Sequence, residues 1–167
     1  MLSLYLIRHA KSSWADPGMN DFDRPLNDRG KKNAPFMGKQ LRKRGEQPDL
    51  LVSSTANRAI STARLIAHEL NYSLNKIKPN DALYHASVAT WLKEVNALPD
   101  KKKTIMVFGH NDGITAFANY LTDEEISNIP TCGIVKINFD FDTWKMVSKG
   151  NGTMDYFDYP KRYKENQ

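Results

Sequence analysis

The sequence contains a single cysteine, Cys132, among its 167 residues. One cysteine excludes an intrachain disulfide, and no paired Cys/His spacing typical of a zinc site surrounds it. Long apolar runs are also missing: the first, residues 2–7, is too short for the apolar part of a signal peptide, and no later run could span a membrane. These absences lead us to expect a soluble, cytoplasmic protein of a reducing compartment, with no membrane partner.

Internal repeats and low-complexity linkers are absent from the sequence as well. A chain of 167 residues can bury roughly two-thirds of its unfolded surface without the help of a disulfide or a metal. We therefore expect one compact domain over residues 1–167. From about residue 156 onward the aromatic and basic tail has no clear period, and we expect this tail to be extended.

Positive charge is in excess, with a formal net charge of +5. Much of the excess lies between residues 31 and 44, in residues 101–103 and in the tail from Lys161. These segments are expected to be helix faces, a turn and a terminus, where charge runs are usually solvated, so we expect no nucleic-acid partner. A positive field also favours phosphorylated substrates.

Three short apolar segments share one pattern. Residues 4–7, 50–52 and 105–108 are continuous apolar runs, and each is followed by small or polar residues and then by a helical pattern. Runs of this kind, separated by helices, are typical of parallel strands that are covered on both faces. The sequence therefore predicts an α/β fold: a three-layer α/β/α sandwich around a mostly parallel central sheet.

The clearest helix is predicted over residues 55–70, where small and apolar residues recur at three- and four-residue steps. Ser54 precedes this helix and is a plausible N-cap. An earlier helix should end at Gly45, but Pro35 would cost about 3 kcal/mol in a helix interior. We expect that earlier helix to start near Asn33 or to bend there.

The remaining chain supplies two more helices and a hairpin. Helices are predicted over residues 87–97 and 111–121. Residues 134–147 then begin with apolar side chains at alternate positions, continue through the turn-forming Asp142 and Thr143, and end in a second apolar stretch. This pattern predicts a C-terminal antiparallel hairpin.

The residues best suited to chemistry follow the ends of the predicted strands. Arg8 and His9 close the first apolar run, Arg58 lies in the first turn of the helix after the second, and His110 follows the third. Because ligands bind beyond the carboxyl ends of parallel strands, we expect these side chains to meet at one edge of the sheet. Guanidinium groups match phosphoryl oxygens, and a neutral imidazole can attack phosphorus. The pattern therefore favours phosphoryl transfer.

Each motif alone has an ordinary structural explanation. Arg8 and His9 could form an exposed pair or a cap. His110 and Asn111 could belong to a turn that caps a helix, and Arg58 could be a surface residue. Their joint occurrence, each at the same end of a predicted parallel strand, is what favours catalysis.

These motifs together resemble a known family. The segments "LYLIRHA", "SSTANRAISTA" and "VFGHNDGI" resemble, in order and spacing, three motifs of the histidine phosphatase superfamily, the phosphoglycerate mutase-like group. The segment "DFDRPLNDRGKKNAPFMGKQL" is similar to the small, SixA-like phosphohistidine phosphatase branch of that superfamily. The resemblance covers most of the chain through about residue 121, and it implies a phosphatase.

The resemblance also implies a mechanism. His9 would be the nucleophile that accepts the phosphoryl group, Arg8 and Arg58 would bind its oxygens, and His110 would donate a hydrogen bond to it. Water would then hydrolyse the phosphohistidine. Catalysis of this kind is mainly positioning and charge stabilisation, so neither a metal ion nor another cofactor is implied.

Two further residues match the family near the site. Arg24 and Asn111 would contribute to substrate binding. For Arg24 a salt bridge to Asp21 or Asp23 is an equal alternative. The expected ligand is therefore a phosphorylated substrate that several basic and polar side chains contact.

The chain departs from the family pattern at three places. Ala10 replaces a glycine and Thr55 replaces a proline, and neither change removes a reacting group. The glutamate that larger members use as general acid is missing, because "NDALYHASVATW" offers only Asp81 and His85. His85 is the candidate general acid, or else a structural or surface residue. Since imidazole leaves more easily than an alcohol, we expect phosphohistidine in proteins, or another activated phosphate, as substrate.

Two other functions remain as alternatives. One is a phosphomonoesterase that acts on a small metabolite through the same intermediate on His9. The other is a non-catalytic module that binds phosphate or nucleic acid. Retention of both histidines, His9 and His110, and of both arginines, Arg8 and Arg58, argues against the non-catalytic alternative.

Overall fold

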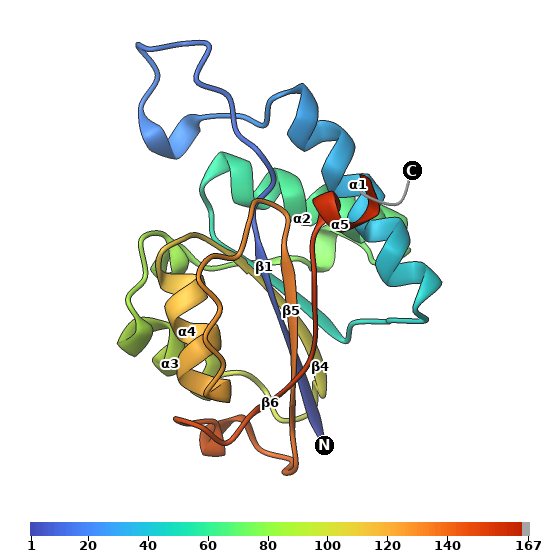
Figure 1. Cartoon of the computed structure of the whole chain (residues 1–167), viewed down its shortest axis with the longest axis vertical. Helices are drawn as coiled ribbons and strands as arrows, with labels where there is room; N and C mark the ends of the chain where they lie inside the picture. Colours follow the sequence, from blue (N-terminus) through green and yellow to red (C-terminus); the bar gives the residue numbers. More distant parts are fainter. Residues whose placement is uncertain (165–167) are drawn as a thin grey trace.

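A six-stranded sheet forms the middle layer of the computed structural model, which describes residues 1–164. The strand order is β3-β2-β4-β1-β5-β6 (Figure 1). The strands are β1 (Leu2–Arg8), β2 (Leu50–Ser53), β3 (Lys78–Pro79), β4 (Thr104–Gly109), β5 (Ile134–Phe139) and β6 (Thr153–Asp158). The first four strands in that order pair in parallel, whereas β5 pairs antiparallel with both β1 and β6. The predicted mostly parallel sheet with a C-terminal antiparallel hairpin is confirmed.

Helices cover both faces of this sheet (Figure 1). One side carries α1 (Asp28–Lys43), α2 (Asn57–Glu69) and α5 (Pro160–Lys164), and the other carries α3 (Val88–Asn96) and α4 (Gly113–Thr122). The apolar run of β1 serves both layers. Leu4 and Leu6 pack in the cluster with α3 and α4, and Tyr5 and Ile7 pack in the cluster with α1 and α2. Burial on both faces explains why residues 4–7 of this strand form a continuous apolar run.

Both predicted helices on the α1 side begin at other residues than expected. Helix α1 starts at Asp28, where the side chain of Asn27 accepts a hydrogen bond from the amide of Gly30, and it continues through Pro35. Its buried face packs on α2, and this packing outweighs the local preference of proline. Helix α2 starts at Asn57 without a side-chain cap, so the prediction that Ser54 is its N-cap is wrong.

The second strand of the C-terminal hairpin lies later in the chain than predicted. The apolar stretch near Trp144 is a short 3₁₀ helix, and the partner of β5 is β6. Trp144 is fully buried and its indole N–H donates to the carbonyl of Lys102 at 2.8 Å. The burial of Trp144 and Val147 therefore reflects core packing rather than a strand.

The tail predicted from about residue 156 is mostly regular structure. Its first residues complete β6, and residues 160–164 form α5, so the expected extended tail is wrong for this part. The end of the predicted tail, residues 165–167, lies outside the described residues. Among residues 1–164, no helix is long and apolar enough to cross a membrane.

Strand register fixes the edge at which the site forms. β1 pairs with β4 up to Arg8 opposite Gly109, and β2 pairs with β4 up to Ser53 opposite Phe108. The residues that follow these strands therefore emerge at one level of the sheet. They leave it at its carboxyl edge, where parallel α/β proteins bind ligands.

Gly109 is packed so closely that a larger residue should destabilise the protein. A Cβ atom at this position would lie 2.8 Å from Cη2 of the buried Trp91 and closer still to Cζ2. We expect Gly109→Ala to lower the free energy of unfolding by about 1–3 kcal/mol, the usual cost of overpacking. Urea unfolding followed by tryptophan fluorescence measures this change.

Gly18→Ala is the matched control, because a Cβ atom there would meet only ordinary contact distances, the nearest atom being Asp16 Oδ1 at 3.4 Å. Its unfolding curve should overlie that of the unmodified protein. Equal stability of both variants would contradict the packing described for Gly109.

Candidate active site

One cavity at the carboxyl edge of the sheet contains every residue predicted for the site. Its volume is about 290 Å³. The predicted residues in its wall are Arg8, His9, Arg24, Arg58, His85, His110 and Asn111. They come from the end of β1, the loop before α1, the first turn of α2, the loop before α3 and the loop after β4. Their proximity agrees with the expected location of the site, and their individual roles stay predictions.

His9 is held in one orientation by its neighbour in sequence. Its Nδ1 lies 2.7 Å from the carbonyl oxygen of Ala10. A carbonyl oxygen can only accept a hydrogen bond, so Nδ1 carries the ring proton and Nε2 keeps its lone pair. The Ala10 amide in turn donates to Thr62 Oγ1 at 2.9 Å, which ties this turn to α2. The free nitrogen of His9 is therefore the one suited to nucleophilic attack.

The environment of His9 keeps its ring neutral. Burial lowers the pKa of His9 from its ordinary value of 6.5 to about 4. The hydrogen bond to Ala10 opposes this shift, whereas the positive charges of Arg58, Arg8 and Arg24 add to it. Only 7% of the residue is exposed. At neutral pH the lone pair on Nε2 is therefore available.

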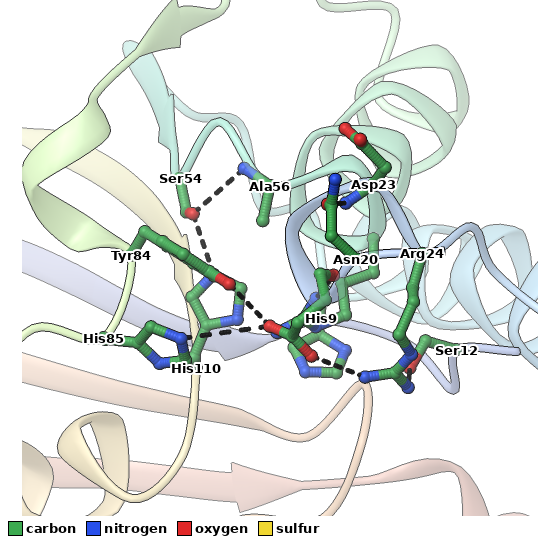
Figure 2. Close-up of polar contacts among 12 residues, drawn as sticks. His9, Ser12, Asn20, Asp23, Arg24, Ser54, Ala56, Tyr84, His85 and His110 are labelled. Carbon is green, nitrogen blue, oxygen red and sulfur yellow. Dashed lines mark hydrogen bonds and ion pairs between the residues drawn. The ribbon is translucent and has the colours of Figure 1, made fainter. Parts of the chain in front are cut away.

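His110 lies beside His9, with 5.2 Å between the two ring centroids (Figure 2). Its Nε2 lies 2.7 Å from Ser54 Oγ, and its Nδ1 is buried without a hydrogen-bond partner in the protein. Burial first, and then the nearby His9 and Arg58, lower the pKa of His110 to about 3. His110 is therefore a neutral ring with one polar atom that lacks a partner.

Asp21 holds two arginines of the cavity side by side. Arg58 donates from Nη2 to Asp21 Oδ2 at 2.9 Å and from Nη1 to the Asp21 carbonyl at 2.7 Å. Arg24 donates from Nη1 to Asp21 Oδ1 at 2.8 Å. Thus Arg24 makes the predicted salt bridge to Asp21 and also lines the cavity, and the two interpretations of this residue are compatible.

Asp21 also accepts a hydrogen bond from the Tyr84 hydroxyl at 2.6 Å. Burial by itself raises the pKa of the Asp21 carboxyl, but the hydrogen bonds from Tyr84, Arg58 and Arg24 outweigh it and hold this pKa well below its usual range. The carboxyl is therefore ionised at neutral pH. It orients the arginines and has no proton to give.

Arg8 adds a third guanidinium to the cavity. Its Nη1 donates to the carbonyl of Ile129 at 2.9 Å, and its Nε is buried without a partner. Burial lowers the pKa of Arg8 from 12.5, but a guanidinium remains charged at neutral pH. A buried donor without a partner costs free energy, and an anion in the cavity would satisfy it.

His85 lies at the rim of the cavity (Figure 2). Its side chain is 64% exposed, and its Nε2 is 3.8 Å from Asp21 Oδ2. The ring centroid is 4.0 Å from that of Tyr84 and 6.4 Å from that of His110. His85 can thus reach solvent and a leaving group, although it lies farther from His110 than His9 does.

Asn111 lines the cavity, but its amide is already engaged by neighbouring residues. Its Nδ2 donates to Asn128 Oδ1 at 2.5 Å and to the Ile129 carbonyl at 3.3 Å. Its Oδ1 accepts from Thr115 Oγ1 at 2.6 Å. Both amide hydrogens are used, so the side chain has no donor left for a phosphoryl oxygen. Its geometry fits support of the loop after β4 better than direct substrate binding.

Sequence reasoning missed three parts of this site. Asp21 was considered only as an alternative partner of Arg24, Ser54 only as a helix cap, and Tyr84 not at all. Tyr84 adjoins His85 in the sequence, and Ser54 follows a predicted strand, so position gave a weak signal for both. Their hydrogen-bond partners come from other loops and depend on the tertiary fold.

Metal binding has no obvious place at this site. Throughout residues 1–164, no three His, Cys, Asp or Glu side chains gather in a way that could hold a metal ion. The positive charge of the cavity comes instead from three arginines and from Lys11. A neutral imidazole beside fixed guanidinium groups can bind an anion and attack its central atom.

Comparison with known proteins gives consistent matches. The family model described as the histidine phosphatase superfamily (branch 1) matches residues 4–91. An uncharacterised protein of Mycobacterium tuberculosis is 33% identical over 93% of this chain and 100% of its own length.

Solved structures with the same fold also match. A candidate phosphohistidine phosphatase, SixA from Agrobacterium tumefaciens, is 29% identical, with a TM-score of 0.82 over 95% of this chain and 98% of that one. The protein histidine phosphatase SixA in complex with tungstate is 19% identical, with a TM-score of 0.83 over 97% and 99% of the two chains. At that lower identity the second structure is evidence for the fold alone.

Both cavity histidines should stay neutral at pH values well below 6.5, the ordinary pKa of a histidine side chain. Because burial lowers the pKa of His9 to about 4 and that of His110 to about 3, their ring proton resonances should not move between about pH 8 and about pH 5.5. Proton NMR titration measures this, with His9→Ala and His110→Ala used to assign the signals.

The lowered pKa values of His9 and His110 also make the free energy of unfolding depend on pH. An unfolded histidine binds a proton below about pH 6.5 and the folded ones do not, so the stability present above that pH should fall as the pH drops towards 4. Midpoints near pH 6.5 for either ring would contradict the neutral, buried state of the site.

Proposed function

This chain belongs to the histidine phosphatase superfamily, branch 1, and is a phosphatase; we propose that it removes the phosphoryl group from phosphohistidine in proteins, through a covalent intermediate on His9 and without a metal ion. The hydrogen bond from His9 Nδ1 to the Ala10 carbonyl is the observation that carries this proposal. It leaves Nε2 as the basic nitrogen of a neutral ring in an arginine-lined cavity.

In the first step, the lone pair of His9 Nε2 forms a bond to phosphorus while the bond from phosphorus to the leaving group breaks. The leaving group keeps the electron pair of that bond, and a phosphohistidine that carries a proton on its other ring nitrogen departs as neutral imidazole. In the second step, water forms a bond to phosphorus, the bond to Nε2 breaks, and inorganic phosphate leaves. The proton lost by the water passes to the phosphate or the solvent. His9 returns to its starting state, so it acts as a covalent catalyst.

The oxygens of the transferred group would meet donors that the protein leaves without acceptors. Arg8 Nε and His110 Nδ1 are buried and have no partner within the protein. Asp21 already orients Arg24 and Arg58 in the folded protein, so their charges need little rearrangement when a phosphoryl group binds. Charge supplied by arginine performs the stabilising role that a metal ion has in other phosphatases.

The substrate class follows from the shortage of proton donors. Asp21 is ionised and occupied by three donors, so it cannot protonate a leaving group. His85 is a largely exposed ring at the rim. An alkoxide leaving group needs a proton, whereas imidazole leaves readily. This shortage supports phosphohistidine over an alkyl phosphate, in line with the similarity to SixA of Agrobacterium tumefaciens.

Loss of the nucleophile should abolish turnover, whereas loss of one donor should only slow it. We expect His9→Ala to reduce hydrolysis of an aryl phosphate to background, because no other group forms the intermediate. Arg58→Ala should retain measurable activity, lower by roughly 10²- to 10³-fold, the usual effect of removing one preorganised donor. Steady-state kinetics of both variants measure the difference.

The matched control is His68→Ala, which removes an exposed histidine of α2 outside the cavity and should leave the rate unchanged. All assays are run with and without excess chelator, which should make no difference. Full activity of His9→Ala, or loss of activity on chelation and its recovery with a divalent ion, would overturn the mechanism.

The leaving-group argument predicts a preference among substrates. A phosphohistidine peptide should be turned over well and an alkyl phosphate poorly, because the site has no buried acid. His85→Ala should change the first rate little. Phosphate release from both substrates by both proteins measures this. Strong turnover of the alkyl phosphate, abolished by His85→Ala, would instead identify His85 as the general acid of a small-molecule phosphomonoesterase.

A further inference from the structure

Ser54 lies beside His110, and its hydroxyl has two hydrogen-bond partners among the described residues. The residue follows β2, is fully buried, and has its Oγ 2.7 Å from His110 Nε2 (Figure 2). The Ala56 amide donates to the same oxygen at 3.3 Å. These are the hydrogen-bond partners of Ser54 Oγ among the described residues. Because an amide can only donate, His110 is the partner left for the hydroxyl hydrogen.

The hydrogens available on Ser54 and His110 determine which of the two residues donates the hydrogen bond between them. A serine hydroxyl has one hydrogen, and a neutral imidazole has one N–H and one lone pair. If His110 Nε2 carried the ring proton, the Ser54 hydrogen and the lone pair on His110 Nδ1 would both be buried without partners. Each such group costs about 1–3 kcal/mol. If Ser54 donates instead, only the Nδ1–H lacks a partner.

His110 lines the cavity in which a ligand would supply an acceptor for that remaining N–H. Figure 2 shows the ring of His110 between Ser54 and His9. Since Nε2 is engaged by Ser54, Nδ1 is the nitrogen left for the cavity, and it is buried without a partner. An oxygen of a phosphoryl group on its way to His9 would accept from it.

We propose that Ser54 is a positioning residue, whose hydroxyl donates to His110 Nε2 and thereby holds His110 as the Nδ1–H tautomer. The tautomer follows from hydrogen-bond geometry alone. Its use as a donor to the transferred phosphoryl group rests on the proposed function. In this arrangement a serine outside the reacting atoms decides whether His110 presents a donor or a lone pair to the substrate.

The closing experiment reads the tautomer directly. Long-range ¹H–¹⁵N correlation spectra of protein labelled at histidine nitrogen, recorded near pH 7, distinguish a protonated from an unprotonated ring nitrogen. In the unmodified protein we expect His110 to show a protonated Nδ1 and an unprotonated Nε2. In Ser54→Ala the Nδ1–H form should lose its dominance, while His9, held by Ala10, should keep its own Nδ1–H form.

Ser53→Ala is the matched control. Ser53 is equally buried, but its hydroxyl donates to the Ser54 carbonyl at 2.9 Å, so its loss should not alter the His110 tautomer. Ser54→Thr keeps a hydroxyl and should preserve the Nδ1–H form. Phosphatase kcat should fall by roughly 10-fold in Ser54→Ala and should recover in Ser54→Thr.

The possible outcomes separate this proposal from the proposed function. A protonated Nε2 on His110 of the unmodified protein overturns the proposal, even if Ser54→Ala fails to fold. An unchanged tautomer in a folded Ser54→Ala also overturns it. The expected tautomers in a protein without phosphatase activity would support the role of Ser54 in orienting His110 and would reject the proposed function.

Discussion

The parallel pairing of β1 with β4 is the constraint on which the rest of the site depends. Its register places Arg8 opposite Gly109, so His9 and His110 are the residues that directly follow two adjacent strands. Their ring centroids lie 5.2 Å apart. Two cores hold these strands, one on each face of the sheet. The distance between His9 and His110 is thus set by strands in the buried core of the fold.

Burial acts differently on the two kinds of basic residue in the cavity, and the chemistry uses this difference. It lowers the pKa of His9 to about 4, so that ring loses its charge at neutral pH. It also lowers the pKa of Arg8, but a guanidinium begins at 12.5 and stays charged. One pocket therefore holds a neutral imidazole beside permanent positive charge. Asp21 orients two of the three guanidinium groups, Arg24 and Arg58.

The sequence was informative wherever a property depended on local pattern. The parallel strands β1, β2 and β4 could be predicted from their apolar runs, and the residues that follow them could be assigned to a site because ligands bind at the carboxyl edge of such sheets. The contacts of Asp21 with Tyr84 and of Ser54 with His110 could not, because these partners are 63 and 56 residues away and meet only in the folded chain. The apolar stretch at Trp144 was wrongly predicted as a strand because its burial, too, depends on the tertiary fold. Burial of a short 3₁₀ helix gives the same composition as a strand.

The central claim is that Nε2 of His9 is the atom that carries the phosphoryl group. The most direct test is to capture the phosphoenzyme by rapid quench in base, map the modified peptide, and assign the ring isomer by ³¹P and ¹⁵N NMR. The hydrogen bond from Nδ1 to Ala10 predicts phosphorylation of His9 at Nε2 alone. A phosphoryl group on Nδ1, on His110 or on His85 would contradict the account.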